Sequence, residues 1–516
     1  MIRFNPYNNL PNINFQANKS VQTRYGFGDK KDADSFQMSV GYVNDIHGQT
    51  NNQLRILSGI EGDLRLSAGD DQIGNEKNRP TNQVTVNFLD SANITARAVG
   101  NHEMDTSVKD FCDLNKGHST HLLAVNIREK ECCADRTEFN EIKKDSFITE
   151  VNGEKIGLLG ACPNDLEERV IKPDVIKDCE LDDYPTTITR IDAEVKRLVS
   201  QGVNKIFLLS HLGHEKNVDI AQRVEGIDVI IGGHSHELLK DIKEGQNLLY
   251  SPNGAPVVIT QAGKDGHHFG LLNLEFDKEG VITKAQNNIL KTRNYPKSYV
   301  HEYIANQYLG KPEVVGEIKS AVPVPENVLI NENPHANFVC DAMREMTGAE
   351  IGLWNNTAAR NSFHVGVINS RDVKDIAPFA DDMTVIPITE KELVDGFNLA
   401  IKRTFTRDNH KPGLHAVSGL KYTVSKSKKA LVDMSFVDKD GNIYPIDINN
   451  PRADKVYKVA TDKFIATGGD DIPMFNKLSE AYEIYPYSKN VMVCDYLKQQ
   501  KEPVEINQVG RVIVVD

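Results

Sequence analysis

Long apolar runs and a surplus of positive charge are both missing from this chain of 516 residues. No stretch of about eighteen apolar residues occurs, so the sequence predicts no membrane-spanning helix. The 60 Lys and Arg residues are outnumbered by 73 Asp and Glu residues, which leaves a formal net charge of −13. This balance argues against a nucleic acid polymer as the partner, and any phosphate group must be bound by local side chains.

Regular cysteine spacing and a secretory signal are also missing. The seven cysteines include the adjacent Cys132 and Cys133 but no C-x-x-C pair, so neither a thiolate metal site nor a disulfide framework is expected. Residues 1–35 are rich in Asn and lack the apolar segment of a secretory signal, and we expect them to form a flexible leader. Both observations favour a cytoplasmic protein.

What the chain does contain is the composition of an ordinary globular protein, 39% hydrophobic and 26% charged. The chain is too long to fold around a single hydrophobic core, so its length predicts two domains. Strand-like runs alternate with helical stretches such as 186–200, and a stretch with Gly and several Pro follows. We therefore expect an α/β domain at 36–295, a linker helix at 296–328 and a smaller α/β domain at 329–516.

Side chains that can bind metals recur between residues 45 and 236, each where a short apolar run ends. The fragments are V-N-D-I-H-G, L-S-A-G-D-D, V-G-N-H-E-M-D, L-L-S-H-L-G-H-E and V-I-I-G-G-H-S-H. Each run is typical of a buried strand, and in an open α/β sheet the carboxyl ends of such strands carry the site. The predicted ligands are Asp45, His47, Asp70, Asn101, His211, His234 and His236, and His102 accompanies them.

Two adjacent cations would use these side chains. Asp45 and His47 are two residues apart, so on an extended strand end they share a face and can hold one ion. Asp70, on a tight G-D-D turn, could bridge two ions about 3.5–4 Å apart, the separation found in two-metal hydrolytic sites. The remaining Asn and His side chains would complete two mixed N/O shells, which accept Zn, Mn, Co or Fe. A single buried His is more often a hydrogen-bonded core residue, so the ordered series is what favours metal binding.

His102 and Asp105 are expected to form a catalytic pair. They lie three positions apart in the sequence, and a carboxylate at this spacing can orient an imidazole at the start of a helix. The imidazolium could stabilise charge on a phosphate or protonate the leaving oxygen, while a metal-activated hydroxide acts as the nucleophile.

In this order, D-x-H, G-D, G-N-H-E-M-D, S-H-L-G-H-E and G-G-H-S-H resemble the calcineurin-like metallophosphoesterases. The segment SHLGHEKNVDIAQRVEGIDVIIGGHSHELL is similar to the two-domain 5′-nucleotidase branch, the UDP-sugar hydrolase/5′-nucleotidase type. The resemblance covers about 40–515 and implies a four-layer α/β/β/α metallophosphoesterase domain followed by a smaller α/β substrate-binding domain. It also implies catalysis by His102, assisted by Asp105. One metal would be held by Asp45, His47, Asp70 and His236, and the other by Asp70, Asn101, His211 and His234.

The same resemblance implies a substrate site in the second domain. W-N-N-T-A-A-R is similar to the family's N-G-G-G-I-R, which makes Arg360 the phosphate-binding residue, although the glycines are missing. The helix after A-P-F-A-D-D-M-T-V offers Asn398 and Arg403 as further candidates. F-I-A-T-G-G-D-D resembles F-I-A-N-G-G-D-G, so Phe464 would stack on a base and Asp470 would bind ribose hydroxyls. Leu414 replaces the family's second stacking aromatic, where it or His415 could cover the base.

The sequence therefore predicts a metal-dependent phosphomonoester hydrolase, with a nucleoside 5′-monophosphate as the expected substrate. The alternatives within the family are a 2′,3′-cyclic-nucleotide phosphodiesterase/3′-nucleotidase and a UDP-sugar hydrolase. A protein phosphatase is disfavoured, because its catalytic domain needs no second domain with F-I-A-T-G-G-D. A non-enzymatic nucleotide-binding protein is disfavoured by the intact His102 and Asp105. The resemblance also allows a periplasmic or extracellular location.

Overall fold

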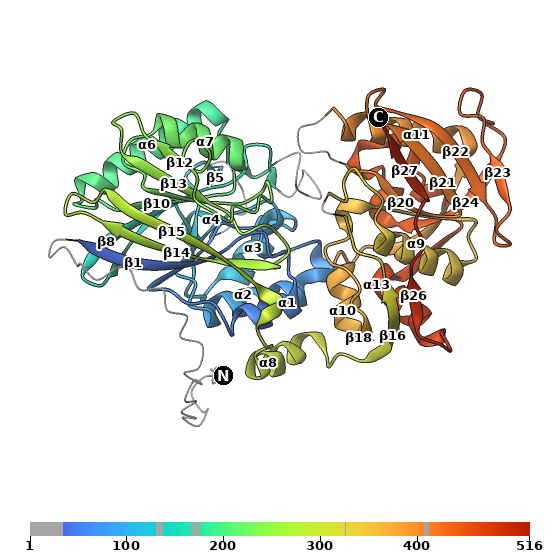
Figure 1. The fold of residues 1–516 in the computed structure, drawn as a ribbon, viewed down its shortest axis with the longest axis horizontal. Helices are drawn as coiled ribbons and strands as arrows, with labels where there is room; N and C mark the ends of the chain where they lie inside the picture. Colours follow the sequence, from blue (N-terminus) through green and yellow to red (C-terminus); the bar gives the residue numbers. More distant parts are fainter. Residues whose placement is uncertain (1–34, 131–137, 167–169, 171–175, 326, 407–411) are drawn as a thin grey trace.

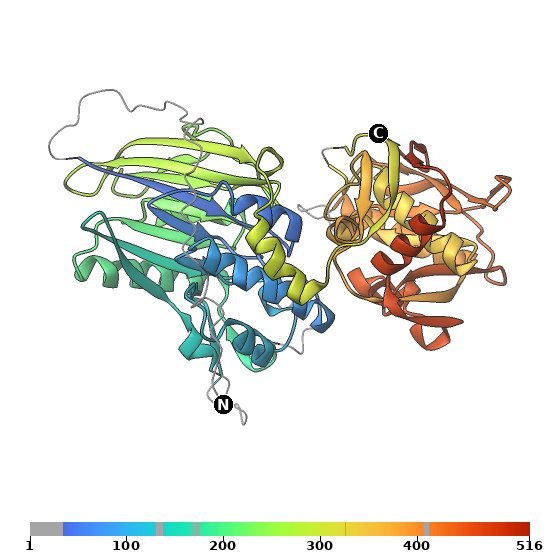
Figure 2. The ribbon, with the colours of Figure 1, turned by 90° about the horizontal axis from the view of Figure 1, so that it is seen from below.

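The computed structural model describes residues 35–130, 138–166, 170, 176–325, 327–406 and 412–516. It contains an N-terminal body and a C-terminal body that lie side by side, with helix α8 (Tyr299–Leu309) at their junction (Figures 1 and 2). The predicted leader, apart from Ser35, and the pair Cys132 and Cys133 lie outside the described residues.

Two β-sheets pack against each other in the N-terminal body. The first runs in the order β15 (Ile282–Lys291), β14 (His268–Phe276), β1 (Phe36–Val43), β2 (Leu64–Ser67), β3 (Ala96–Ala98), β4 (His121–Leu123) and β6 (Lys143–Lys144). The second runs in the order β12 (Leu248–Tyr250), β13 (Pro256–Thr260), β11 (Val229–Gly232), β10 (Ile206–Ser210), β8 (Glu154–Ala161) and β7 (Ser146–Val151). Val40 and Leu66 of the first sheet share one buried core with Phe207 and Val229 of the second.

Helices cover the outer face of each sheet. On the second sheet, α6 (Tyr184–Ser200) and α7 (His214–Arg223) bury Val195 and Ile220 in a core that includes Leu208. On the first, α1 (Thr50–Ile56) and α2 (Arg79–Ser91) contribute to a core that includes Val43. The body is thus layered α/β/β/α, which confirms the predicted fold class.

Local sequence explains where α6 begins. The side chain of Asp183 accepts a hydrogen bond from the Thr186 amide at 2.9 Å, and Pro185 occupies the first turn, where its missing N–H costs nothing. The helix predicted over 186–200 is therefore confirmed and begins at Tyr184. The smaller elements of this body are η2 (Glu76–Asn78), η3 (His102–Met104), α3 (Val108–Asn115), β5 (Ile127–Glu129), α4 (Phe139–Ile142), β9 (Cys179–Leu181) and η5 (Thr292–Asn294).

The parallel strands of both sheets direct their carboxyl ends to a common edge. β1, β2 and β3 are paired in parallel in the first sheet. β8, β10, β11 and β13 are paired in parallel in the second. Residues distant in the sequence therefore converge where these strands end.

The C-terminal body has its own sheets and core. Its largest sheet runs in the order β20 (His415–Ser418), β17 (Ile351–Asn355), β24 (Val456–Asp462), β19 (Asp382–Thr389) and β25 (Glu483–Ser488). A second sheet has β23 (Ile443–Pro445), β22 (Ala430–Val437), β21 (Leu420–Ser425) and β27 (Val512–Val515), and a third has β18 (Gly366–Asn369), β16 (Val314–Ala321) and β26 (Val504–Ile506). The helices are α9 (Pro334–Thr347), η6 (Asn356–Ala358), α10 (Ser370–Ile376), α11 (Glu390–Thr404), α12 (Lys463–Ala466), η7 (Gly469–Asp471), η8 (Pro473–Phe475), η9 (Leu478–Glu480) and α13 (Lys489–Gln499). Trp354 is fully buried in the core that these elements share.

The range 296–328, expected as a linker, contains both α8 and β16, and β16 pairs with β18 and β26 of the C-terminal body. The connection proper is therefore α8 and the few residues around it. At its start the Ser298 amide donates to Leu54 O at 2.8 Å. At its end Arg371 of α10 donates to Asn306 Oδ1 at 2.7 Å and to Gly310 O at 3.0 Å. Within the described ranges, no helix combines the length and apolar character needed to cross a bilayer.

Candidate metal centre

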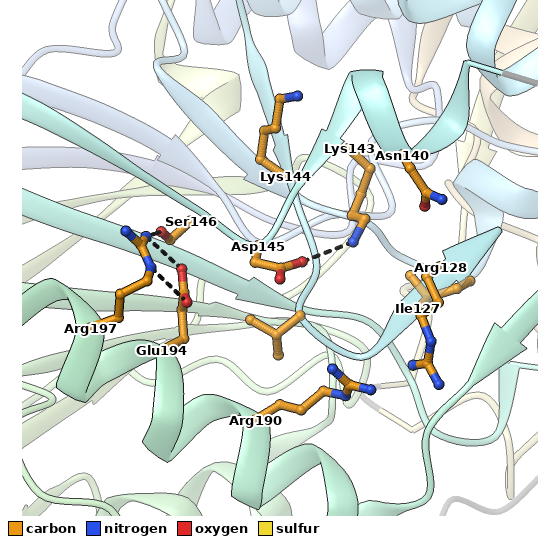
Figure 3. A pocket seen from close by; sticks show the side chains of 11 residues that line it. Ile127, Arg128, Asn140, Lys143, Lys144, Asp145, Ser146, Arg190, Glu194 and Arg197 are labelled. Carbon is orange, nitrogen blue, oxygen red and sulfur yellow. Dashed lines mark hydrogen bonds and ion pairs between the residues drawn. The ribbon is translucent and has the colours of Figure 1, made fainter. Parts of the chain in front are cut away.

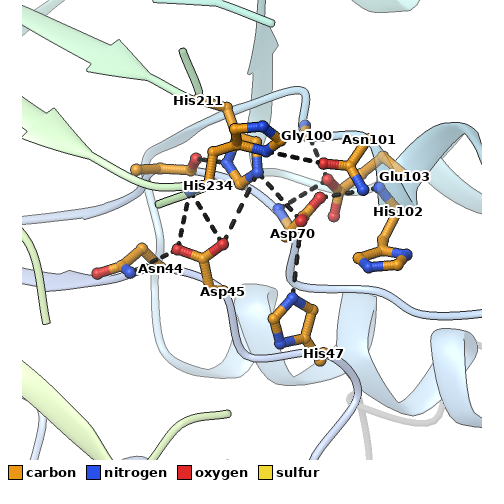
Figure 4. Close-up of polar contacts among 12 residues, drawn as sticks. Asn44, Asp45, His47, Asp70, Gly100, Asn101, His102, Glu103, His211 and His234 are labelled. Carbon is orange, nitrogen blue, oxygen red and sulfur yellow. Dashed lines mark hydrogen bonds and ion pairs between the residues drawn. The ribbon is translucent and has the colours of Figure 1, made fainter. Parts of the chain in front are cut away.

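The side chains predicted to bind metals follow parallel strands at the common edge of the two sheets (Figure 4). Each lies within five residues of the end of its strand, so the backbone of the sheet sets its position. Asp45 and His47 follow β1, Asp70 follows β2, Asn101 and His102 follow β3, His211 follows β10, and His234 and His236 follow β11.

The structure brings these side chains together in groups that could each hold a metal ion. Asp45, His47 and His236 offer ligand atoms that lie within 4.8 Å of one another, and Asp70, His211 and His234 do the same. Each of these groups contains three of the four residues predicted for one shell, and a third group, His47, Asp70 and His102, overlaps both. His47 Nε2 lies 3.6 Å from Asp70 Oδ2, and His211 Nε2 lies 3.1 Å from the same oxygen. Asp70 therefore stands between the two groups, as a bridging carboxylate must.

Asn101, the remaining predicted ligand, lies beside the second group. Its Oδ1 is 3.1 Å from His234 Nδ1. His236 lies on the other side, with Nε2 at 3.4 Å from Asp45 Oδ1. Every predicted ligand therefore has a contact to another member of the set.

Unpaired ring nitrogens indicate that the site fits divalent cations. His47 Nε2 and His211 Nε2 are buried and have no hydrogen-bond partner. The other ring nitrogen of each residue makes a hydrogen bond. His211 Nδ1 donates to Ala68 O at 2.6 Å, and His47 Nδ1 donates to Asp265 Oδ1 at 2.9 Å. Atoms that bind one ion at about 2.0–2.2 Å lie roughly 3–4 Å apart, which matches the spacing here. The N/O donor set is one that Zn, Mn, Co or Fe accepts.

The electrostatic field at this edge favours positive charge. Burial opposes ionisation of Asp45, but His236 and His211 lower its pKa to about 2. Burial likewise opposes a charged His211, but Asp70 and Asp45 raise its pKa to about 10. The buried carboxylates thus create a negative potential that cations would neutralise.

Backbone strain is concentrated at the same place. Among the described residues, eleven other than glycine have a positive φ, and five of them belong to the predicted ligand set. Asp and His tolerate this left-handed conformation better than most residues, and strained backbone often marks functional sites. The five values are Asp45 49°, His47 52°, Asp70 52°, His234 74° and His236 63°.

Glu103 holds the turn that carries Asp70. Its carboxylate accepts hydrogen bonds from the backbone amides of Asp70 and Gly100, each at 2.8 Å, of Asp71 at 2.9 Å and of Gln72 at 3.1 Å. This buried side chain therefore satisfies the amides of a turn that no strand pairing reaches. It was not among the predicted site residues.

His102 and Asp105 form the predicted pair. His102 Nδ1 lies 2.6 Å from Asp105 Oδ2, and because the carboxylate accepts, the nitrogen carries the proton. The His102 amide donates to Asp70 Oδ1 at 2.8 Å, which ties the pair to the metal centre. Burial disfavours the charged ring, but the carboxylates of Asp105 and Asp70 raise the pKa of His102 above its usual value.

The C-terminal body contributes Arg360 to this edge. Arg360 Nη1 lies 4.0 Å from Asp265 Oδ1 of the N-terminal body. Its guanidinium lies over the ring of Phe379, 5.5 Å from the centroid, and that ring is 6.1 Å from the ring of His102. Arg360 Nε is buried without a hydrogen-bond partner. The predicted phosphate-binding arginine thus faces the predicted catalytic histidine across the junction.

Comparison with known proteins agrees with both halves of this arrangement. Residues 38–238 match the calcineurin-like phosphoesterase family, and residues 314–477 match the 5′-nucleotidase C-terminal domain family. This chain is a calcineurin-like metallophosphoesterase with a 5′-nucleotidase C-terminal domain. Members of this family hydrolyse phosphoesters with divalent metal ions, and this phosphoesterase is a hydrolase of that class.

Individual relatives are similar over most of the phosphoesterase. It is 26% identical to the 5′-nucleotidase of Diplobatis ommata, over 93% of this chain and 90% of that protein. It is 24% identical to the trifunctional nucleotide phosphoesterase protein YfkN of Bacillus subtilis, over 92% of this chain but 35% of that longer protein. The 5′-nucleotidase precursor of Thermus thermophilus has the same fold, with a TM-score of 0.73, 24% identity, and coverage of 93% of this chain and 100% of that one.

The residues expected to bind a nucleoside lie in or beside helices of the phosphoesterase's C-terminal body. Phe464, in α12, is half-buried and packs on the core. Asp470, in the G-G-D-D turn, accepts a hydrogen bond from Asn355 Nδ2 at 3.0 Å and has a φ of 57°. Arg403 donates to the carbonyl oxygens of Asp470 at 2.9 Å and Asp471 at 2.6 Å. Arg403 therefore supports the turn that carries Asp470.

Asn398 and Leu414 have structural contacts of their own. Asn398 Oδ1 accepts from the Leu431 amide at 3.0 Å, which joins α11 to β22. Leu414 is 1% exposed and belongs to the core. His415 is also buried and packs edge-on against Phe475, with 6.0 Å between the centroids. In this conformation neither Leu414 nor His415 presents a free face to a base.

A cavity of about 530 Å³ lies elsewhere in the phosphoesterase, between α6 and the strands β6 and β7 (Figure 3). Most of its basic residues are paired with carboxylates, and no predicted site residue lines it. The pairs include Arg197 with Glu194 at 2.8 Å, Lys143 with Asp145 at 2.9 Å, and Arg128 with Asp182 at 3.0 Å. This cavity therefore offers few unpaired charged groups to a ligand and is separate from the candidate metal centre.

Sequence reasoning missed Asp265, Phe379 and Glu103. Asp265 follows the apolar run P-V-V-I-T of β13, and it could have been found by the same pattern that located the other site residues. Phe379 lies in A-P-F-A-D-D-M-T-V, which served only to locate the helix that offers Asn398 and Arg403. Glu103 lies inside G-N-H-E-M-D, but a carboxylate that binds only backbone amides has no signature in the sequence.

Proposed function

We propose that this phosphoesterase is a 5′-nucleotidase that releases phosphate from nucleoside 5′-monophosphates. The observation that carries the proposal is the meeting of the two bodies: Arg360 lies 4.0 Å from Asp265 at the metal centre, on the same Phe379 ring that lies near His102. A phosphate bound between Arg360 and His102 would lie next to the C-terminal body, which carries Arg360 and would bind the nucleoside. The relatives named 5′-nucleotidase support the same substrate class.

Two divalent ions, drawn from Zn, Mn, Co or Fe, are the proposed cofactors. The first would be held by Asp45, His47, Asp70 and His236, and the second by Asp70, Asn101, His211 and His234. When bound, such ions lower the pKa of water enough to supply a nucleophile at neutral pH and neutralise charge on the phosphate.

The chain's own residues position the ester and handle its leaving group. Arg360 binds the phosphate oxygens through its planar guanidinium. Asp105 holds the proton on His102 Nδ1, so that Nε2 of the imidazolium can stabilise the developing charge or protonate the departing 5′ oxygen. Phe464 would stack on the base, and Asp470 would accept hydrogen bonds from the ribose hydroxyls.

A second candidate substrate class is favoured by the burial of Leu414. The proposed clamp has one aromatic ring where two are expected, which weakens selection for a base on a monophosphate. A 2′,3′-cyclic nucleotide or a UDP-sugar would present its phosphate to the same centre.

Phosphate release from a panel of esters tests these alternatives. We expect Mn²⁺-dependent hydrolysis of 5′-monophosphates to exceed that of cyclic nucleotides and nucleotide sugars. Arg360→Ala should raise KM by about 10–100-fold, which corresponds to the free energy of one hydrogen bond between charged groups. Arg360→Lys should raise KM by less, because it keeps the positive charge. Faster hydrolysis of cyclic nucleotides or UDP-sugars than of any 5′-monophosphate would reverse the assignment.

A further inference from the structure

Asp265 is a buried acidic residue at the metal centre that lies outside the predicted ligand set. It follows β13 in the turn G-K-D-G and is 1% exposed. Its φ is 56°, and the flanking Gly263 and Gly266 have φ of 80° and 61°. Three of the four residues 263–266 are therefore left-handed, and this turn places the Asp265 carboxylate at the edge of the second sheet, beside the end of β1.

Both members of the D-x-H pair contact Asp265. Its Oδ1 lies 2.9 Å from His47 Nδ1, and its backbone amide donates to Asp45 O at 2.6 Å. Asn52 Nδ2 in turn donates to Asp265 O at 2.8 Å, which fixes the turn against α1. The side chain and the backbone of one residue thus hold the two residues that would bind the first metal ion.

The contact with His47 determines which nitrogen of the ring faces the metal centre. A carboxylate only accepts, so His47 Nδ1 carries the proton and donates it to Asp265. The lone pair is left on Nε2, the buried atom that has no hydrogen-bond partner and lies 3.6 Å from Asp70 Oδ2. A carboxylate behind a metal-binding imidazole fixes its orientation and increases its basicity.

Two cations also approach the same carboxylate. Lys264 Nζ lies 3.6 Å from Oδ2, and Arg360 Nη1 lies 4.0 Å from Oδ1. Because Arg360 belongs to the C-terminal body, the carboxylate that orients His47 also faces the arginine proposed to bind phosphate. Asp265 therefore joins the metal centre to the junction between the bodies.

We infer that Asp265 is a positioning residue that fixes His47 for metal binding and so determines how tightly the Asp45, His47 and His236 group retains its ion. The inference deepens the proposed function: it rests on the metal-dependent hydrolysis stated there and is independent of the choice of nucleotide. In this role Asp265 touches neither the phosphate nor the reacting water.

Metal binding to the full-length protein, stripped of metal and titrated with Mn²⁺ in a calorimeter, tests this role. We expect Asp265→Ala to weaken one of the two binding events by about 10–100-fold and to leave the other unchanged. Asp265→Asn, which retains an acceptor but loses the charge, should have a smaller effect on the same event. Matching Mn²⁺ affinities in wild type and in folded Asp265→Asn and Asp265→Ala would overturn the inference.

Asp90→Asn is the matched control, because Asp90 makes an equivalent contact with His118 Nδ1, at 2.6 Å, away from the metal centre. This variant should bind Mn²⁺ as the wild type does. Circular dichroism of each stripped variant reports folding, and if Asp265→Ala is unfolded, Asp265→Asn decides the question. An equal loss of affinity at both sites in the folded Asp265→Asn variant would also overturn the inference, since it would indicate a general rather than a positioning effect.

A kinetic measurement separates positioning from catalysis. Hydrolysis by Asp265→Asn should fall at low Mn²⁺ and recover to near the wild-type kcat at saturating Mn²⁺, whereas a kcat that stays low at saturation would contradict a positioning role. The Mn²⁺ affinities are measured without substrate, so they test the role of Asp265 even if the protein hydrolyses no nucleotide. In that case the proposed function fails and the inference on Asp265 is still tested.

Discussion

The metal centre and the proposed nucleoside site differ in how their side chains are held. At the metal centre, each candidate ligand follows a parallel strand, contacts a neighbour in the set and, in five cases, adopts a left-handed backbone. In the C-terminal body, Phe464 lies in the four-residue helix α12 and Asp470 in the 3-10 helix η7, and the expected second base-covering residue, Leu414, is buried. The candidate metal ligands are thus positioned by paired strands, whereas the proposed nucleoside-binding residues depend on short helical segments outside the sheets.

Removal of the metals should have the largest effect on activity, and it should affect the metal centre without affecting the proposed nucleoside site. We expect a chelator to abolish hydrolysis of every ester, because the metal ions supply the nucleophile, and added Mn²⁺ to restore it. Binding of a nucleoside without phosphate, measured by calorimetry, should persist in the stripped protein. Loss of nucleoside binding together with the metals would show that the two regions are not independent.

His102→Ala should have the next largest effect and should act on all substrates alike. We expect kcat to fall by about 10²–10⁴-fold for a nucleotide and for a simple aryl phosphate, because the imidazolium acts on the ester itself. Mn²⁺ binding should be unchanged. A large loss with the nucleotide but not with the aryl phosphate would place His102 in substrate selection instead.

Phe464→Ala should have a smaller effect, confined to nucleotides. Stacking of a base on an aromatic ring contributes about 1–3 kcal/mol, so KM for a nucleotide should rise by roughly 5–150-fold. The kinetics with an aryl phosphate are the internal control and should be unchanged. Equal effects on the two esters would mean that Phe464 supports the fold rather than a base.

The smallest expected effect concerns the junction of the two bodies. Asp375 of α10 is buried there, with Oδ2 accepting from the Asn51 amide at 3.1 Å, and burial raises its pKa to about 7. The folded protein therefore binds an extra proton between the ordinary pKa of Asp and about pH 7, so this group contributes less stability as the pH rises through that window. Asp375→Asn should raise the thermal stability more at pH 8 than at pH 5. An equal change at both pH values would contradict this.

Particular residues show which parts of the fold could be predicted from the sequence. The apolar runs before Asp45, Asp70, His211 and His234 located the strands, and the helix predicted over 186–200 is α6. The α/β/β/α layering and the family are confirmed as well. The sequence did not reveal that 314–321 is a strand of the C-terminal body, because V-V-G-E-I-K-S-A pairs with β18 and β26 from distant parts of the chain.

The sequence by itself determined the kind of chemistry, because a series of Asp, Asn and His residues at strand ends has few other uses. Only the tertiary structure decided which of these side chains oppose one another, that Arg360 reaches the metal centre, and that Asp265 lies behind His47. These contacts join residues from distant parts of the chain, and they depend on the left-handed turns and on the packing of two bodies across α8. Local residue patterns encode the strands and the turns, but the geometry between them arises only when the sheet edges and the two cores are assembled.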